Sequence, residues 1–161
     1  MDQAKCRETL GRLISEESSA LQELSTLLDR EHDFLQSNDV NSLEGATRER
    51  QRCVARILRV DEERRKLCRD LGHPLDPKGL EGLIRWCDPK GTLAGRWTEC
   101  SDAAAKCRAR NDRNGALVAA RLKHVEARLD ILIDSRREAV TYGPRGAYGH
   151  ATSGRVVVTE A

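Results

Sequence analysis

The sequence predicts an all-α protein: an elongated antiparallel three-helix bundle or coiled coil, with a short linker helix and a flexible C-terminal tail. Three observations lead to this fold class. Apolar residues recur at alternating steps of three and four over long stretches, which is the spacing of a helical seam. Charged residues make up 34% of the 161 residues and aromatic residues only 3%, which is typical of long helices with solvated outer faces. Gly and Pro gather in two segments that separate or follow the periodic stretches.

The longest periodic stretch predicts a helix over residues 92–138, with Thr92 as its cap. Its seam runs through Leu93, Trp97, Cys100, Ala104, Cys107, Asn111, Asn114, Val118, Arg121, Val125, Leu129 and Leu132. One helix cannot bury such a seam alone, so the rest of the chain must supply a partner surface.

Two further helices are predicted before it, over residues 5–36 and 40–69. The polar run Ser37-Asn38-Asp39 separates them, and Asp39 is expected to be the N-cap of the second. A connection this short makes the two helices antiparallel neighbours. Arg50 and Arg64 fall on the second seam, where their aliphatic stems are expected to cover apolar surface while their charged heads reach water.

Residues 71–89 contain several helix breakers and leave room for one short helix, over about residues 78–87. Its expected buried side is Leu80, Leu83, Ile84 and Trp86, and it is expected to plug the end of the bundle. The helical bundle is therefore predicted to occupy residues 1–138. A glycine-rich tail with both tyrosines, residues 139–161, follows and is expected to be flexible.

Composition and motifs exclude several classes of function. The net charge of +2 argues against nucleic acid as the main partner. No apolar run is long enough to span a membrane, and the first residues lack the layout of a secretory signal, so the six cysteines are expected to be thiols in a reducing cytoplasm. Neither a phosphate-binding glycine loop nor a metal-ligand spacing stands out, so we expect no enzyme, catalytic residue, cofactor or metal. Cys100 and Cys107 are interpreted as small buried hydrophobes.

Two features of the long helix have more than one interpretation. Asn111 and Asn114 lie on the seam and are followed by Gly115. They either fix the register of the bundle or bond an incoming chain, and a mid-helix glycine favours the close approach of another backbone. The second feature is an apolar surplus at Ile131-Leu132-Ile133, which the tail, a second copy of the chain or a partner helix could cover.

At this point the chain resembles the FlgN family, the flagellar type III export chaperones for hook–filament junction proteins. The resemblance rests on the motif Asn111-x-x-Asn114-Gly115-x-Leu117-Val118, on Leu122, Val125, Leu129 and Leu132, and on the tail motif Tyr142-Gly143-Pro144-x-Gly146. The leucine-rich first half, with Leu21, Leu24, Leu28, Glu31, Leu35, Asp39 and Leu43, agrees with the family's helical hairpin.

The resemblance implies a cytoplasmic chaperone that binds the C-terminal amphipathic helix of junction proteins, prevents their premature assembly and delivers them to the export gate. The implied client-binding residues are Asn111, Asn114, Leu117, Val118, Leu122, Val125, Leu129 and Leu132. Tyr142 is implied in docking to the cytoplasmic domain of the export gate. The competing hypothesis is a structural coiled-coil adaptor without chaperone activity, which would form a tight homodimer through the apolar surplus.

Overall fold

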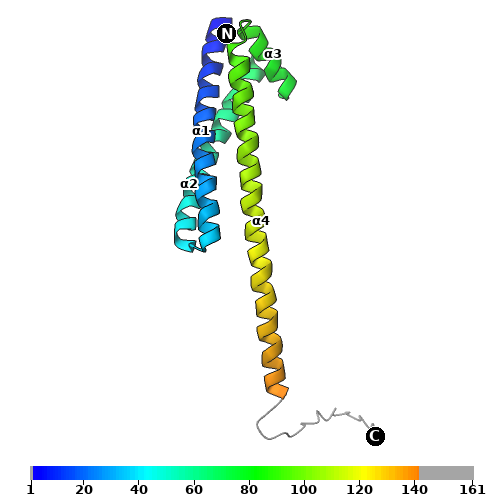
Figure 1. Ribbon diagram of the computed structural model, residues 1–161. Helices are drawn as coiled ribbons and strands as arrows, with labels where there is room; N and C mark the ends of the chain where they lie inside the picture. Colours follow the sequence, from blue (N-terminus) through cyan, green and yellow to red (C-terminus); the bar gives the residue numbers. More distant parts are fainter. Residues whose placement is uncertain (1, 142–161) are drawn as a thin grey trace, which may run out of the picture. The chain divides into compact units, whose positions relative to one another are not determined.

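The computed structural model describes the backbone of residues 2–141 and the side chains of residues 2–133, and this part of the chain is all helical. Its elements are α1 (Gln3–Ser37), α2 (Val40–Asp70), α3 (Pro77–Cys87) and α4 (Thr92–Thr141) (Figure 1). The predicted all-α fold class, with three long helices and one short one, is confirmed. α4 runs past residue 138 because Ala139, Val140 and Thr141 are compatible with a helix, while the first breakers are Gly143 and Pro144. The remainder of the expected tail lies outside the described residues.

The chain divides into two compact units within α4, residues 1–119 and residues 120–161. Seam residues of α4 are buried at Leu93, Cys100, Cys107 and Asn114, whereas Val118 is already 49% exposed. The three-helix core therefore belongs to the first unit alone.

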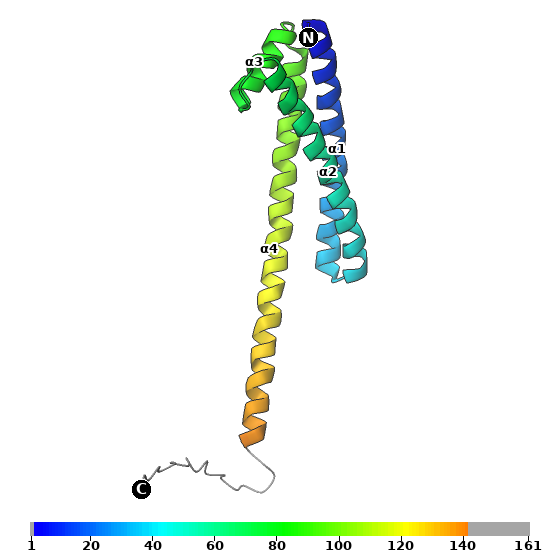
Figure 2. The same ribbon diagram turned by 180° about the vertical axis from the view of Figure 1, so that it is seen from behind.

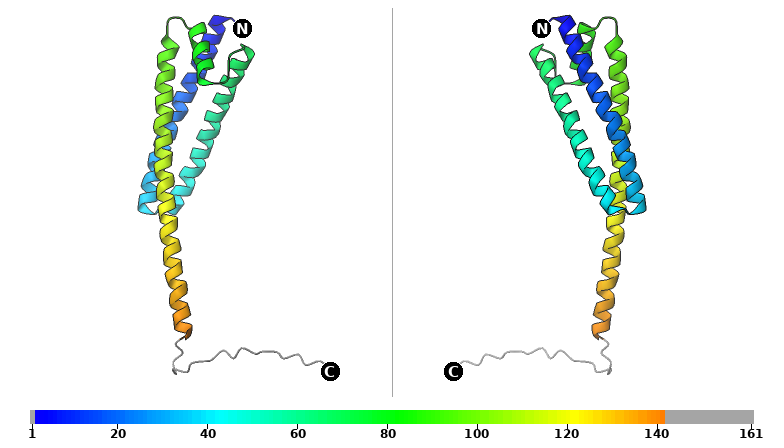
Figure 3. Two further views of the ribbon diagram at one scale, coloured as in Figure 1. Left: turned by 90° about the vertical axis from the view of Figure 1, so that its right-hand side faces the viewer. Right: turned by 90° about the vertical axis from the view of Figure 1, so that its left-hand side faces the viewer.

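A tight turn joins α1 to α2. Asn38 adopts a left-handed conformation with φ of 61°, which asparagine tolerates better than most residues. The side chain of Asp39 then accepts a hydrogen bond from Ser42 N at 3.1 Å, so the predicted N-cap is confirmed. Figure 3 shows that the two helices meet at this turn and run obliquely to each other.

α3 lies beside the N-terminal end of α1, at the opposite end of the hairpin from the Asn38 turn (Figure 2). Asp76 caps it by accepting from Gly79 N at 2.7 Å, and Pro77 occupies its first turn. A side chain at Gly79 would place its Cβ 2.0 Å from the Pro74 carbonyl oxygen, so only glycine fits there.

The buried face of α3 consists of Leu80, Leu83, Ile84 and Cys87. The expectation that Trp86 would join it was wrong, because its side chain is 39% exposed. At 100° per residue, Cys87 lies between Leu83 and Leu80 around the helix, whereas Trp86 lies about 60° outside that sector. The small Cys87 thiol is therefore buried at this end of the bundle, and the large Trp86 ring lies at its edge.

α4 begins with a side-chain cap that the sequence did not indicate. Asp88 is only 3% exposed, and its carboxylate accepts a hydrogen bond from Leu93 N at 2.6 Å. Thr92 was the expected cap, but it is the first helical residue. The carboxylate also favours the positive end of the helix dipole at this position.

A buried ion pair connects α1 and α2 in the middle of the first unit. Arg64 is 9% exposed and donates to the carboxylates of Glu17 and Asp61, the latter at 2.6 Å. The guanidinium carbon also lies 4.6 Å from the centre of the Trp97 ring of α4. The expectation that this arginine head would reach water was wrong, because Glu17 supplies a buried counter-charge.

Arg50, the other arginine of the α2 seam, is half-buried. Its Nε donates to Glu31 of α1 at 2.8 Å, and Glu31 is only 5% exposed. Both seam arginines of α2 thus bind a buried carboxylate on α1, which fixes how the two helices of the hairpin slide past each other.

We predict a pH-dependent difference between the wild type and Glu17→Gln. Burial raises the pKa of Glu17 above 4.5, although the neighbouring Arg64 acts in the opposite direction. Between the unfolded and folded pKa values the folded state binds more protons, so the contribution of Glu17 to stability increases as the pH falls. Urea unfolding from pH 7 to about pH 5 should show the free energy of unfolding of the wild type rising relative to Glu17→Gln. A relative decrease would mean that Arg64 outweighs burial.

Candidate functional site

Exposed apolar side chains gather on one stretch of α4. Seven of the eleven large hydrophobic residues that are exposed in the described part of the chain lie between residues 118 and 133. They are Val118 (49% exposed), Leu122 (59%), Val125 (51%), Leu129 (53%), Ile131 (68%), Leu132 (62%) and Ile133 (52%). Monomeric proteins rarely leave such a contiguous surface uncovered without a binding role.

Five of these residues share one face of the helix. The steps from Val118 to Leu132 are four, three, four and three residues, which is the spacing of a coiled-coil seam. We call Val118, Leu122, Val125, Leu129 and Leu132 the apolar stripe. Leu117, also expected in the site, is half-buried and lies beside its first residue.

Within the second unit, a shallow hollow of about 470 Å³ lies on this surface. It is lined by Val125, Arg128, Leu129, Ile131 and Leu132. Four of the five lining residues are aliphatic, so the hollow suits an apolar side chain of another helix better than a polar small molecule. Arg128 gives one edge of it a positive charge.

Asn114 lies inside the bundle rather than on the exposed surface. Its side chain is 5% exposed, and its Nδ2 donates to the Leu28 carbonyl of α1 at 2.8 Å. Its Oδ1 lies 3.0 Å from Nδ1 of His32, whose Nε2 lies 3.0 Å from Nε2 of Gln36. Because Gln36 Nε2 is a donor, this network assigns the proton of His32 to Nδ1, which donates to Asn114.

The oxygen and the nitrogen of the Asn114 amide thus both bond to α1. This agrees with the interpretation that Asn114 fixes the register of α4 against α1. In this arrangement the amide is not available to an incoming chain. Asn111 differs, because its side chain is exposed. The two asparagines that the sequence groups together therefore lie in different environments.

Acidic and basic side chains strengthen the same junction of α1 and α4. Asp29 accepts from Arg110 at 3.0 Å and from Arg113 at 3.3 Å. Sequence reasoning did not assign a role to Asp29 or to His32. The available signal was their spacing along α1, since residues three apart lie on the same side of a helix.

The comparison with protein families decides what kind of protein carries these features. A family model described as FlgN protein matches residues 1–150. The chain belongs to the FlgN family. FlgN proteins are chaperones of flagellum assembly, so this chain belongs to a family that acts in flagellar export rather than in catalysis. No curated protein and no solved structure matches it.

The glycine next to the Asn114 site of this FlgN protein has open space around it. A Cβ built on Gly115 meets no other atom within 4 Å, whereas the sequence indicated a close backbone approach there. Nothing in the described part of the chain fills that space. The space beside Gly115, three residues before the first residue of the apolar stripe, is therefore open.

All six cysteines of this FlgN protein are free and buried. The Sγ of Cys107 donates to the Leu21 carbonyl at 3.3 Å, and burial raises the pKa of every cysteine thiol, in the case of Cys6 to about 12. The interpretation of Cys100 and Cys107 as small core residues is confirmed. Among residues 2–133, His, Cys, Asp and Glu form no group of three that could hold a metal ion. None of the described helices is apolar enough over its length to cross a bilayer. Tyr142, the residue expected to dock to the export gate, lies outside the described residues.

We expect Asn114→Ala to destabilise the FlgN fold and Asn111→Ala to leave it nearly unchanged. Removing the buried amide takes away the bonds that the Leu28 carbonyl and Nδ1 of His32 make with it, which costs about 1–3 kcal/mol. The exposed Asn111 has no such partners to lose, so its substitution should stay within about 0.5 kcal/mol. Urea unfolding of the two variants measures both values, and equal losses would contradict the register role of Asn114.

Proposed function

We propose that this chain is a cytoplasmic export chaperone that binds the C-terminal amphipathic helix of hook–filament junction proteins. The observation that carries the proposal is the apolar stripe, whose five members are between 49% and 62% exposed. Binding through a helix needs anchors at steps of three, four and seven residues, and the stripe supplies them. The proposal further includes delivery of the client to the cytoplasmic domain of the flagellar export gate.

The bundle does not have to open for this binding. The seam of α4 up to Asn114 is already used in the core of the first unit, while the stripe begins at Val118. A client helix that covers the stripe therefore adds apolar burial without removing any from the core. At about 25 cal/mol per Å² of apolar surface removed from water, this burial supplies most of the driving force for binding.

The chemical consequence is protection, not catalysis. The client helix can self-assemble through its exposed apolar face. While that face lies against the apolar stripe, self-assembly is prevented. Release at the export gate returns that face to the client. We propose no nucleotide hydrolysis by the chaperone itself, so the exchange depends on relative binding affinities at the gate.

We predict that Leu129→Asp weakens binding of a junction-protein C-terminal helix by about 10- to 100-fold, because a leucine side chain is worth about 1.5–3 kcal/mol when fully buried. Isothermal titration calorimetry measures the change. Ala127→Asp is the matched control, since it adds the same charge on the opposite face of α4. Circular dichroism should show the same helix content for both variants. Equal affinity of Leu129→Asp and the control would contradict the stripe as the binding surface.

A second experiment separates the chaperone from a structural coiled-coil adaptor. An adaptor would use the apolar stripe to form a tight homodimer and would ignore client helices. Light scattering of the free protein, and again after addition of the client helix, distinguishes the two. A stable dimer that binds no junction-protein helix at micromolar concentration would favour the adaptor.

We also propose that Tyr142 docks to the export gate, and we predict that Tyr142→Ala preserves client affinity while it reduces binding to the cytoplasmic domain of the gate. Tyrosine is an effective interface anchor because its ring buries a large apolar area while its hydroxyl forms a hydrogen bond. Tyr148→Ala is the matched control from the same segment of sequence. A pull-down with the gate domain measures the effect, and undiminished binding by Tyr142→Ala would remove this role.

A further inference from the structure

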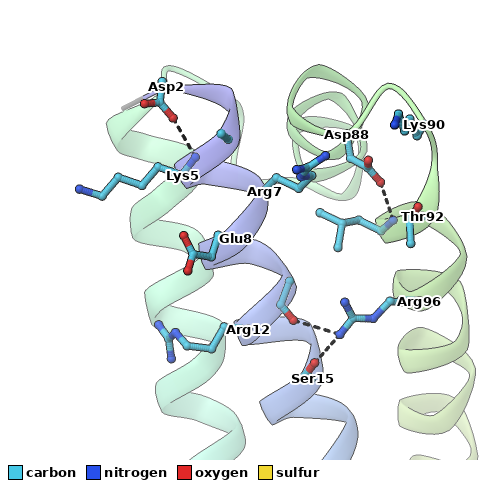
Figure 4. Close-up of a pocket in the computed structure, with 13 residues that line it drawn as sticks. Asp2, Lys5, Arg7, Glu8, Arg12, Ser15, Asp88, Lys90, Thr92 and Arg96 are labelled. Atoms are coloured by element: carbon cyan, nitrogen blue, oxygen red, sulfur yellow. Dashed lines mark hydrogen bonds between the residues drawn. The ribbon is translucent and has the colours of Figure 1, made fainter.

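A groove of about 950 Å³ lies in the first unit between the first turns of α1 and the start of α4 (Figure 4). It has no part in the client binding proposed above, and it is lined by charged rather than apolar side chains. Five lining residues are basic, namely Lys5, Arg7, Arg12, Lys90 and Arg96, and three are acidic, namely Asp2, Glu8 and Asp88. The lining therefore carries a net charge of 5 − 3 = +2.

Three of the five basic side chains are available to bind a ligand. Lys5, Arg7 and Lys90 are exposed, and none of their side chains forms an ion pair with another described residue. In Figure 4, Lys5 extends from the side of α1 away from α4, Arg7 extends from α1 toward α4, and Lys90 lies on the linker that leads into α4. Positive charge is thus present on α1 and at the start of α4, the two segments that border the opening.

The other two cations are already bound. Arg12 pairs with Glu16 at 3.4 Å and with Glu63 at 3.3 Å. Arg96 donates to the Gly11 carbonyl at 3.1 Å and to the Ser15 hydroxyl. They shape the wall of the groove and hold α4 against α1.

Two of the three carboxylates are committed to helix caps. Asp2 accepts from Lys5 N at 2.8 Å, and Asp88 accepts from Leu93 N at 2.6 Å. Only Glu8 is exposed without a bonding partner in the described part of the chain. The groups available to a ligand are therefore three cations against one carboxylate, which leaves a net charge of 3 − 1 = +2.

The floor of the groove is smooth and elongated. Ala4, Gly11 and Ser15 are small, and a Cβ at Gly11 would come within 3.4 Å of Leu93 Cδ2, which shows how closely α4 approaches α1. At 1.5 Å per residue, the distance along α1 from Ala4 to Ser15 is roughly 16 Å. This length suits about three turns of a helix and exceeds what a single small anion needs.

We propose that this groove docks an acidic helical segment of a partner protein. Its carboxylates bind the exposed Lys5 and Arg7 of α1 and Lys90 before α4, while its small or apolar residues lie over Gly11 and Leu93. A protein segment fits better than nucleic acid, because an evenly charged phosphate backbone would have to pass Glu8. A helix places a neutral or basic side chain at that point and acidic ones one turn away.

The test uses a synthetic three-heptad helical peptide with glutamate at both flanking positions, and a twin with lysine in their place. Fluorescence anisotropy with the full chain should show binding of the acidic peptide only, and the affinity should fall as salt is added. Lys5→Glu combined with Lys90→Glu should weaken binding by about tenfold or more. Glu8→Gln should strengthen it, an effect that a merely structural role of Glu8 would not produce.

Lys66→Glu combined with Lys78→Glu is the matched control, since both lysines are exposed on α2 and α3, do not line the groove, and change the net charge equally. Circular dichroism confirms that each variant is folded. Equal losses in the groove variant and the control would overturn the proposal, as would equal binding of the two peptides. Tighter binding of a single-stranded oligonucleotide, lost in the groove variant, would assign the groove to phosphates and would also overturn it.

Discussion

The buried guanidinium of Arg64 sets the arrangement of the first unit. A charge with so little exposure is tolerated only where it is bonded on several sides, and Glu17, Asp61 and the ring of Trp97 provide those contacts from three helices. Sliding α1 against α2 by one residue would separate Glu17 from Arg64 and leave a buried charge without its partner on α1. Leucine-rich seams alone permit several registers of similar energy, so this ionic contact selects among them.

The fold was predictable because most of its determinants are local. Heptad spacing, the Ser37-Asn38-Asp39 break and the proline-rich linker identify four helices to within a few residues at their ends. The errors arose where the outcome depended on contacts between elements. Whether Arg64 reaches water depends on Glu17, forty-seven positions away, and the cap of α4 comes from Asp88 because the linker folds back on it.

The candidate site was predictable in its apolar part and not in its polar part. The apolar stripe from Val118 to Leu132 can be read from the three- and four-residue spacing of the sequence. The two asparagines look equivalent in sequence, yet Asn114 bonds to α1 while Asn111 is exposed. Only the placement of Leu28 and His32 tells them apart, and this placement is a property of the packed helices. The family match covers residues 1–150 and assigns the chain to the FlgN family.

The burial of all six native thiols has a practical use. Because each is enclosed and held in its protonated form, maleimide reagents at neutral pH should ignore the wild-type chain. A single cysteine introduced at a solvent-facing position would then be the sole reactive handle, with no need to replace the native ones. Dyes or spin labels attached in this way could follow each of the two units of the chain separately, with the native core residues unchanged.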